Sequence, residues 1–178
     1  MTGALLLGGA STRFGSPKAL ARLGDETLAE RAWRVLGELT GDRLAVGKIA
    51  DGLDLPFPLT DDRSDVRAPI AGVVAALRSA QHDVCVVLPV DCPLVTPAML
   101  AALADACEGS IDVAVPQTGP LPGAYRARTL AALERALTAG ELSLRSVLAE
   151  LSVSVVACDA RLLANVNTPD ELLRLRSV

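Results

Sequence analysis

The chain has 178 residues, of which 51% are hydrophobic and 21% charged, and its formal net charge is −4. So much apolar surface excludes a disordered chain, and the length predicts a single domain over residues 1–178. Aromatic residues make up only 2%, which excludes modules that stack bases on aromatic rings. No run of lysine or arginine breaks the acidic balance, so we expect neither nucleic acid nor a membrane as a partner.

The four cysteines show neither C-x-x-C spacing nor a histidine at zinc-binding spacing, so we expect reduced, structural thiols. The apolar run at the N-terminus covers only residues 4–7 before two glycines. It is too short for a signal peptide or a membrane span. These features predict a cytoplasmic protein.

Short apolar runs bounded by turn residues predict the strands. Their runs are continuous rather than alternating, which is typical of strands covered on both faces. The predicted strands are residues 4–7, 43–46, 84–90, 111–115 and 153–157.

Apolar residues at spacings of three and four predict the helices. Thr96-Pro97 and Thr168-Pro169 mark two helix starts, and Glu171 completes a capping box at the second. Because strands and helices alternate, we expect an α/β fold with a mostly parallel sheet and helices on both faces. The predicted helices are residues 27–39, 70–77, 98–106, 130–137 and 144–151, followed by the one that starts at Thr168-Pro169.

Residues 116–128 interrupt this alternation. Their prolines and glycines exclude a regular helix, and residues 123–126 can form a short strand. The segment is either a surface excursion or part of a substrate pocket.

In an open parallel sheet, ligands bind at the carboxyl ends of the strands. The first predicted strand is followed by a glycine-rich stretch, residues 8–18, in which Ser11 and Thr12 carry hydroxyls and Arg13 and Lys18 carry positive charge. Glycines let backbone N–H groups turn toward an anion. The stretch matches neither the Walker A motif nor G-x-G-x-x-G. It predicts a triphosphate-binding loop, and the alternative is an ordinary glycine-rich turn.

Asp91 follows the strongest predicted strand. A carboxylate at that place is costly to bury without a partner. A Mg²⁺ ion that also binds phosphate oxygens would be such a partner, whereas the alternative is that Asp91 caps the next turn.

Two further polar clusters follow strand ends or precede a helix. Asp61, Asp62 and Asp65 form an acidic cluster, which is either a solvated loop or part of a nucleotide site. Asn165 and Asn167 precede the last predicted helix. They either stabilise a turn or face a polar ligand.

Taken together, these segments resemble the molybdenum cofactor guanylyltransferase (MobA-type) family of MobA-like NTP transferases. The opening L-L-L-G-G-A-S-T-R-F-G-S-P-K-A-L is similar to that family's L-x-G-G-x-S-x-R-x-G-x-x-K-x-L signature. P-V-D-C-P-L, A-P-I-A-G, P-L-P-G-A-Y-R and N-V-N-T-P-D-E-L resemble its later motifs. The matches run in the family's order from residue 5 to residue 172.

The resemblance implies a Rossmann-like, three-layer αβα nucleotidyltransferase that transfers GMP from GTP to molybdopterin and releases pyrophosphate. Lys18, Arg13 and Asp91 would be catalytic, with Asp91 as the Mg²⁺ ligand. Asn165 and Asn167 would lie on the pterin side, and a cofactor-delivery or insertase protein would be a partner. The nucleotide-binding residues would be Leu6, Leu7, Gly8, Gly9, Ser11, Arg13, Lys18, Asp61 and Asp91.

Three other interpretations stay open at this point. One is a CTP-dependent cytidylyltransferase for the same pterin, although Gly8-Gly9 favours guanine because the CTP-using relatives tend to carry Ala-Gly. Another NTP transferase of the same fold is the second. The third, from a different class, is a non-catalytic nucleotide-binding regulatory module; the presence of Arg13, Lys18 and Asp91 argues against it.

The chain also departs from the family pattern. Residues 45–48 (A-V-G-K) stand where the family often has Asn, which bears on a base or ribose contact. Ala68 stands where the family has a glycine, and Gly123 precedes Ala124-Tyr125 in the P-L-P-G-A-Y-R motif. Both departures bear on the shape of the acceptor pocket. Of the four rings, Phe14 and Tyr125 lie in motif segments, so they are the ones expected near the site.

Overall fold

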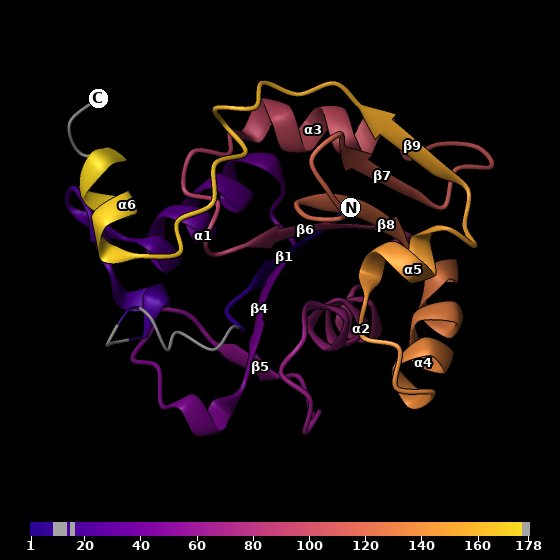
Figure 1. Ribbon diagram of the computed structural model, residues 1–178, viewed down its shortest axis with the longest axis horizontal. Helices are drawn as coiled ribbons and strands as arrows, with labels where there is room; N and C mark the ends of the chain where they lie inside the picture. The colour runs from indigo at the N-terminus through magenta and orange to yellow at the C-terminus, as the bar shows by residue number, and fades with distance from the viewer. Residues whose placement is uncertain (9–13, 15–16, 176–178) are drawn as a thin grey trace.

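The computed structural model describes residues 1–8, 14 and 17–175. Its centre is a seven-stranded sheet with the order β5-β4-β1-β6-β8-β7-β9 (Figure 1). Every strand runs in the same direction except β8, which pairs antiparallel with both β6 and β7. The strands are β1 (Thr2–Leu6), β4 (Arg43–Gly47), β5 (Leu59–Asp61), β6 (Val84–Pro89), β7 (Val113–Pro116), β8 (Gly123–Arg126) and β9 (Val153–Val156), with a separate hairpin of β2 (Arg22–Leu23) and β3 (Glu26–Thr27).

Several helices begin at residues whose side chains cap them. Thr27 and Glu30 form a capping box at the first helix, and Thr96 caps the third. Thr168 and Glu171 exchange the same pair of hydrogen bonds at the last helix, as predicted. The helices are α1 (Leu28–Leu39), α2 (Pro69–Ser79), α3 (Pro97–Asp105), α4 (Leu130–Thr138), α5 (Leu144–Leu148) and α6 (Pro169–Leu175).

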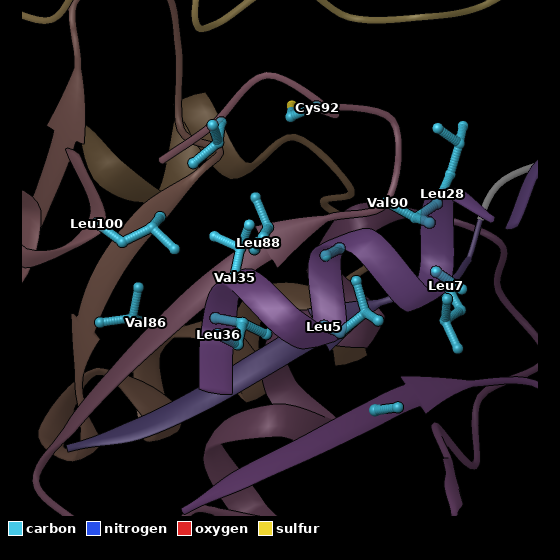
Figure 2. Close-up of a cluster of buried hydrophobic side chains, with 14 of the residues drawn as sticks. Leu5, Leu7, Leu28, Val35, Leu36, Val86, Leu88, Val90, Cys92 and Leu100 are labelled. Carbon is cyan, nitrogen blue, oxygen red and sulfur yellow. The ribbon is translucent and has the colours of Figure 1, made fainter. Parts of the chain in front are cut away.

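Helices cover both faces of the sheet, which confirms the three-layer α/β prediction. α1, α3 and α6 pack on one face, and α2, α4 and α5 on the other (Figure 1). β1 is buried on both sides: Leu5 enters the first core and Leu6 the second. Figure 2 shows Val35 and Leu36 of α1 beside Leu5 of β1 and Leu88 of β6. This double burial explains why the strand sequences are continuous apolar runs.

Some boundaries differ from those predicted. The strand expected at 111–115 begins at Val113, and the helix expected at 144–151 ends at Leu148, after which three-residue turns continue to Leu151. Asp61 is the last residue of β5 instead of lying in a loop. β5 and the β2–β3 hairpin are too short to produce an apolar run that could be recognised in the sequence.

Residues 116–128, which interrupt the alternation of strands and helices, hold the one antiparallel strand of the large sheet, at the predicted residues Gly123–Arg126. The hydroxyl of Tyr125 donates to the carbonyl of Pro120 at 2.6 Å, which closes the turn before β8. A Cβ at Gly123 would lie 2.8 Å from that same carbonyl oxygen, so the turn requires glycine.

The chain order creates a switch point between β1 and β6. After β1 the chain builds β4 and β5 on one side, and then returns to place β6 on the other side. The loops that follow β1 and β6 therefore diverge, which leaves a crevice at their carboxyl ends. No helix among the described residues is both long and apolar enough to cross a membrane.

Candidate functional site

A cavity of about 470 Å³ opens at the carboxyl ends of β1 and β6. This volume is in the range of small-molecule sites, and its place is the one predicted from the parallel sheet. The described residues that line it come from the ends of β1 and β6 and the segments after them, the start of α2, the β7–β8 connection, the start of α5 with the turn before it, and the segment before α6. They are Leu6, Leu7, Gly8, Lys18, Pro69, Pro89, Val90, Asp91, Thr118, Gly119, Pro120, Leu121, Leu142, Ser143, Leu144, Arg145 and Asn165.

Lys18 and Asp91 meet at one end of this cavity. The Nζ of Lys18 lies 3.4 Å from Oδ2 of Asp91 and 3.2 Å from Oδ1 of Asn167. The exposed fractions of the two charged side chains are 16% and 26%, so the pair is shielded but still reachable from the cavity. The structure thus brings together two predicted catalytic residues and one predicted pterin-side residue.

The backbone around Asp91 is held from two sides. The N–H of Val90 donates to the carbonyl of Leu6 at 3.0 Å, and the N–H of Val166 donates to the carbonyl of Asp91 at 2.8 Å. No backbone N–H among the described residues donates to the carboxylate, which contradicts the turn-capping alternative for Asp91. The carboxylate instead accepts from side chains: Oδ2 from Nζ of Lys18, and Oδ1 from the thiol of Cys92 at 3.8 Å.

Asn165 is oriented by a cysteine. The Sγ of Cys92 donates to Oδ1 of Asn165 at 3.0 Å, and Asn165 itself lines the cavity. Burial raises the pKa of the Cys92 thiol, and the neighbouring Asp91 carboxylate adds to this effect. A protonated thiol is a donor, so the amide oxygen of Asn165 points to Cys92 and its NH₂ group is left for other partners.

The opposite wall consists of residues 118–121 and 142–145. Nη2 of Arg145 donates to the carbonyl of Thr118 at 2.9 Å and joins the two segments. A Cβ at Gly119 would lie 3.2 Å from Nη2, so this glycine gives the guanidinium room against the backbone. The segment that interrupts the alternation is therefore part of a pocket rather than a plain surface excursion. Sequence reasoning missed Arg145.

The three residues of the acidic cluster differ in burial and in their partners. The carboxylate of Asp61 accepts the N–H groups of Arg63 (2.7 Å) and Ile49 (3.2 Å), which lowers its pKa. Asp62 is buried and forms an ion pair with Lys48, Nζ to Oδ1 at 3.0 Å. Only Asp65 is exposed. Asp61 is not among the described residues that line the cavity, and sequence reasoning missed the role of Lys48.

The two rings expected near the site lie behind it. Tyr125 and Phe14 are both buried in the cores, and neither is among the described lining residues. Tyr125 supports the wall through its bond to Pro120 and belongs to the same apolar cluster as Leu121 and Leu144. Three predicted loop residues, Gly9, Ser11 and Arg13, lie outside the described part of the chain.

The four cysteines are free thiols, as predicted. Three of them are buried, and Cys158 is half-buried.

A mostly parallel sheet with helices on both faces and a cavity at its switch point defines a protein of the doubly wound α/β class. The chain belongs to the MobA-like NTP transferase family, because residues 3–160 match that family's domain model. This confirms the family resemblance seen in the sequence.

Relatives match along nearly the whole chain. A probable molybdenum cofactor guanylyltransferase of Chloroflexus aggregans is 34% identical over 97% of this chain and 91% of its own length. A molybdenum cofactor guanylyltransferase of Desulfosudis oleivorans is 31% identical over 97% of this chain and 92% of its own.

Among solved structures, molybdopterin-guanine dinucleotide biosynthesis protein A from Archaeoglobus fulgidus superposes with a TM-score of 0.86 at 28% identity. That match covers 99% of this chain and 97% of the other. The 2-C-methyl-D-erythritol 4-phosphate cytidylyltransferase of Thermus thermophilus, at 18% identity and a TM-score of 0.76, covers 98% of this chain and 96% of its own and shares the fold.

Proposed function

We propose that this chain is a molybdenum cofactor guanylyltransferase, which transfers GMP from GTP to molybdopterin and releases pyrophosphate. The observation that carries the proposal is the Lys18–Asp91 pair at the switch-point cavity. The full-length relatives with that name support the choice of substrates.

The reaction needs positioning and charge neutralisation more than a strong base. The phosphate of the acceptor is already an anion, so it attacks the α-phosphorus of GTP without first losing a proton, and pyrophosphate leaves in line. Lys18 supplies positive charge to the phosphate oxygens. Arg13 is proposed for the same role.

The residues at the cavity fit a magnesium ion that arrives with the nucleotide. No group of three or more His, Cys, Asp or Glu side chains among residues 1–8, 14 and 17–175 forms a complete metal cage. Protein sites for Mg²⁺ often supply only one or two carboxylates and leave the other positions to substrate phosphates and water. Asp91 would hold the ion, which supplies neutralisation of charge on the reacting phosphates when bound.

The nucleotide half of the cavity is built from backbone. The N–H of Leu7 donates to Val46 at 2.8 Å, which fixes the end of β1. Among the described residues, no atom would lie within 4 Å of a Cβ at Gly8, and Gly8 itself lines the cavity. We propose that Leu6, Leu7 and Gly8 contact the nucleotide through main-chain groups, because backbone without a side chain permits close approach.

The remaining proposals concern the acceptor, further nucleotide contacts, the location of the protein and its partners. We propose that Asn165 and Asn167 contact the acceptor near its reacting phosphate, since Asn167 shares Lys18 with Asp91. Nucleotide contacts by Gly9, Ser11 and Asp61 remain proposals, and so do a cytoplasmic location and an insertase or delivery partner. The single-domain organisation of residues 1–178 stays a prediction.

The test is a transfer assay with purified protein, Mg²⁺, molybdopterin and equal concentrations of GTP and CTP. We expect pyrophosphate and a GMP adduct of the pterin, both resolved by chromatography. A CMP adduct in excess would identify a cytidylyltransferase. Binding of GTP without release of pyrophosphate would identify a non-catalytic module.

A further inference from the structure

Two positively charged side chains line the cavity, and they differ in their partners. Among the described residues these are Lys18, which follows β1 in the chain, and Arg145 of α5. Lys18 forms an ion pair with Asp91. Among the described residues Arg145 has no carboxylate partner, and its guanidinium donates a hydrogen bond to the carbonyl of Thr118.

The guanidinium of Arg145 is nevertheless held in place. One nitrogen is bonded to Thr118, and the backbone of Gly119 lies against it. A guanidinium carries five N–H donors on a rigid plane. Because one bond uses only part of this set, the group is oriented while other donors remain for a ligand.

Apolar side chains accompany this cation. Leu121 lines the same wall, and Leu142 lines it with 42% of its surface exposed, which makes it one of the few large exposed apolar residues. An exposed leucine beside an arginine suits a ligand with an apolar face and hydrogen-bond acceptors at its edge. None of the described residues that line the cavity is aromatic, so a ring bound here would be held by apolar contacts and by hydrogen bonds at its edge.

We propose that Arg145, Leu121 and Leu142 form the subsite for the fused pterin ring of the acceptor, with Arg145 donating hydrogen bonds to the ring's oxygen and nitrogen acceptors. The inference rests on the proposed function, in which the phosphate of the acceptor reacts beside Asp91. The ring at the other end of the acceptor then extends along the cavity, away from Lys18, and reaches the opposite wall. Arg145 is on this basis a specificity-determining residue.

The test separates the ring from the rest of the acceptor. The probe is 6-hydroxymethylpterin, a pterin without the phosphate, titrated by its own fluorescence against the wild type, Arg145→Ala and Arg145→Lys. We expect saturable binding to the wild type and binding about tenfold weaker in Arg145→Ala, as for loss of a hydrogen bond to a charged group. The affinity of Arg145→Lys should fall between those two, because lysine keeps the positive charge but lacks the planar set of N–H donors.

Arg135→Ala is the matched control. Arg135 is an exposed arginine of α4, the helix just before α5, and it is not among the described lining residues. It should leave pterin binding unchanged. A fluorescent GTP analogue should bind all variants equally, and thermal unfolding should be the same because Arg145 is exposed.

The outcomes are distinct. Equal pterin binding in the wild type and Arg145→Ala, or no saturable binding to a wild type that binds the GTP analogue, would overturn the subsite. Loss of affinity for the GTP analogue in Arg145→Ala, with pterin binding intact, would overturn it too, because it would put the guanine on this wall. A wild type that binds pterin through Arg145 but transfers no GMP would contradict the proposed function and leave the subsite standing.

Discussion

The two ends of the cavity are built differently. At the end that holds Lys18, side chains from segments far apart in the chain bond to one another: Lys18 to Asp91 and Asn167, and Cys92 to Asn165. On the opposite wall, residues 118–121 and 142–145 are held by hydrogen bonds to main-chain carbonyls, from Arg145 to Thr118 and from Tyr125 to Pro120. Fixed geometry is needed where a bond is made, because small displacements of reacting atoms cost much of the rate. Binding of a ring tolerates a looser wall.

Removing the carboxylate from the fixed end should have the largest effect. We expect Asp91→Asn to lower the rate of GMP transfer by about two to three orders of magnitude at saturating Mg²⁺, the usual result of deleting one electrostatic contact to a transition state. Steady-state assays check this. Asp105→Asn, an exposed carboxylate of α3, is the control. Near-normal turnover in Asp91→Asn would remove this residue from the mechanism.

The chain's two lysines allow a comparison of chemistry with stability. Lys18→Met should lower turnover by about a hundredfold, because it removes positive charge from the phosphates. In the wild type, Nζ of Lys48 lies 3.0 Å from Oδ1 of the buried Asp62. Lys48→Met leaves Asp62 without this ion-pair partner and should cost about 3 kcal/mol of folding free energy. For a chain of this size, that lowers the Tm by about 6–12 °C.

The second lysine has its own check. Lys48→Met combined with Asp62→Leu removes both buried charges, so we expect the Tm to recover most of the loss. Thermal unfolding and turnover are measured on each variant. If Lys48→Met inactivates a protein of unchanged Tm, the Lys48–Asp62 pair belongs to the nucleotide site instead.

A smaller effect is expected from the thiol that orients Asn165. Cys92→Ala removes the donor at 3.0 Å from Oδ1 of Asn165, and we expect the KM for molybdopterin to rise about fivefold, as for loss of one neutral hydrogen bond. The KM for GTP should not change. Cys92→Ser keeps a donor and should restore most of the affinity. A defect shared equally by Ala and Ser would mean that packing, not the hydrogen bond, matters.

The smallest effect concerns thiol reactivity. Burial raises the pKa of the Cys85 thiol to about 12 and also raises that of Cys92. The thiolate is the reactive form, so a raised pKa keeps these groups protonated and slow to alkylate at about pH 8. We expect iodoacetamide to label Cys158 first, because it is the half-buried cysteine. Mass spectrometry gives the order in which the cysteines are alkylated. Early labelling of Cys92 would show that the part of the cavity around Lys18 and Asp91 opens to solvent.

Local patterns predicted the parts of the fold that depend on local physics. The apolar run of β1, the caps at Thr96 and Thr168, and the strand at Gly123–Arg126 all followed from neighbouring residues. The site was predicted at Lys18 and Asp91 because chain order alone puts strand ends at one edge.

The misses involve partners distant in sequence or main-chain acceptors. Lys48 and Asp62 pair across two strand ends, and Arg145 is held by the carbonyl of Thr118, which any residue type would provide. Cys92 and Asn165 lie 73 positions apart. No spacing rule connects such residues, so the tertiary structure is required to find them.

The hydrogen bond between Lys18 and Asn167 joins residues 149 positions apart, and the N–H of Val166 ties the same late segment to Asp91. Contacts of such long separation form late, because a large loop must close before they are gained. The sheet can therefore be largely assembled while the reacting end of the cavity is still incomplete. An emerging chain with most of its core in place would lack the arrangement around Lys18 until the residues before α6 had docked.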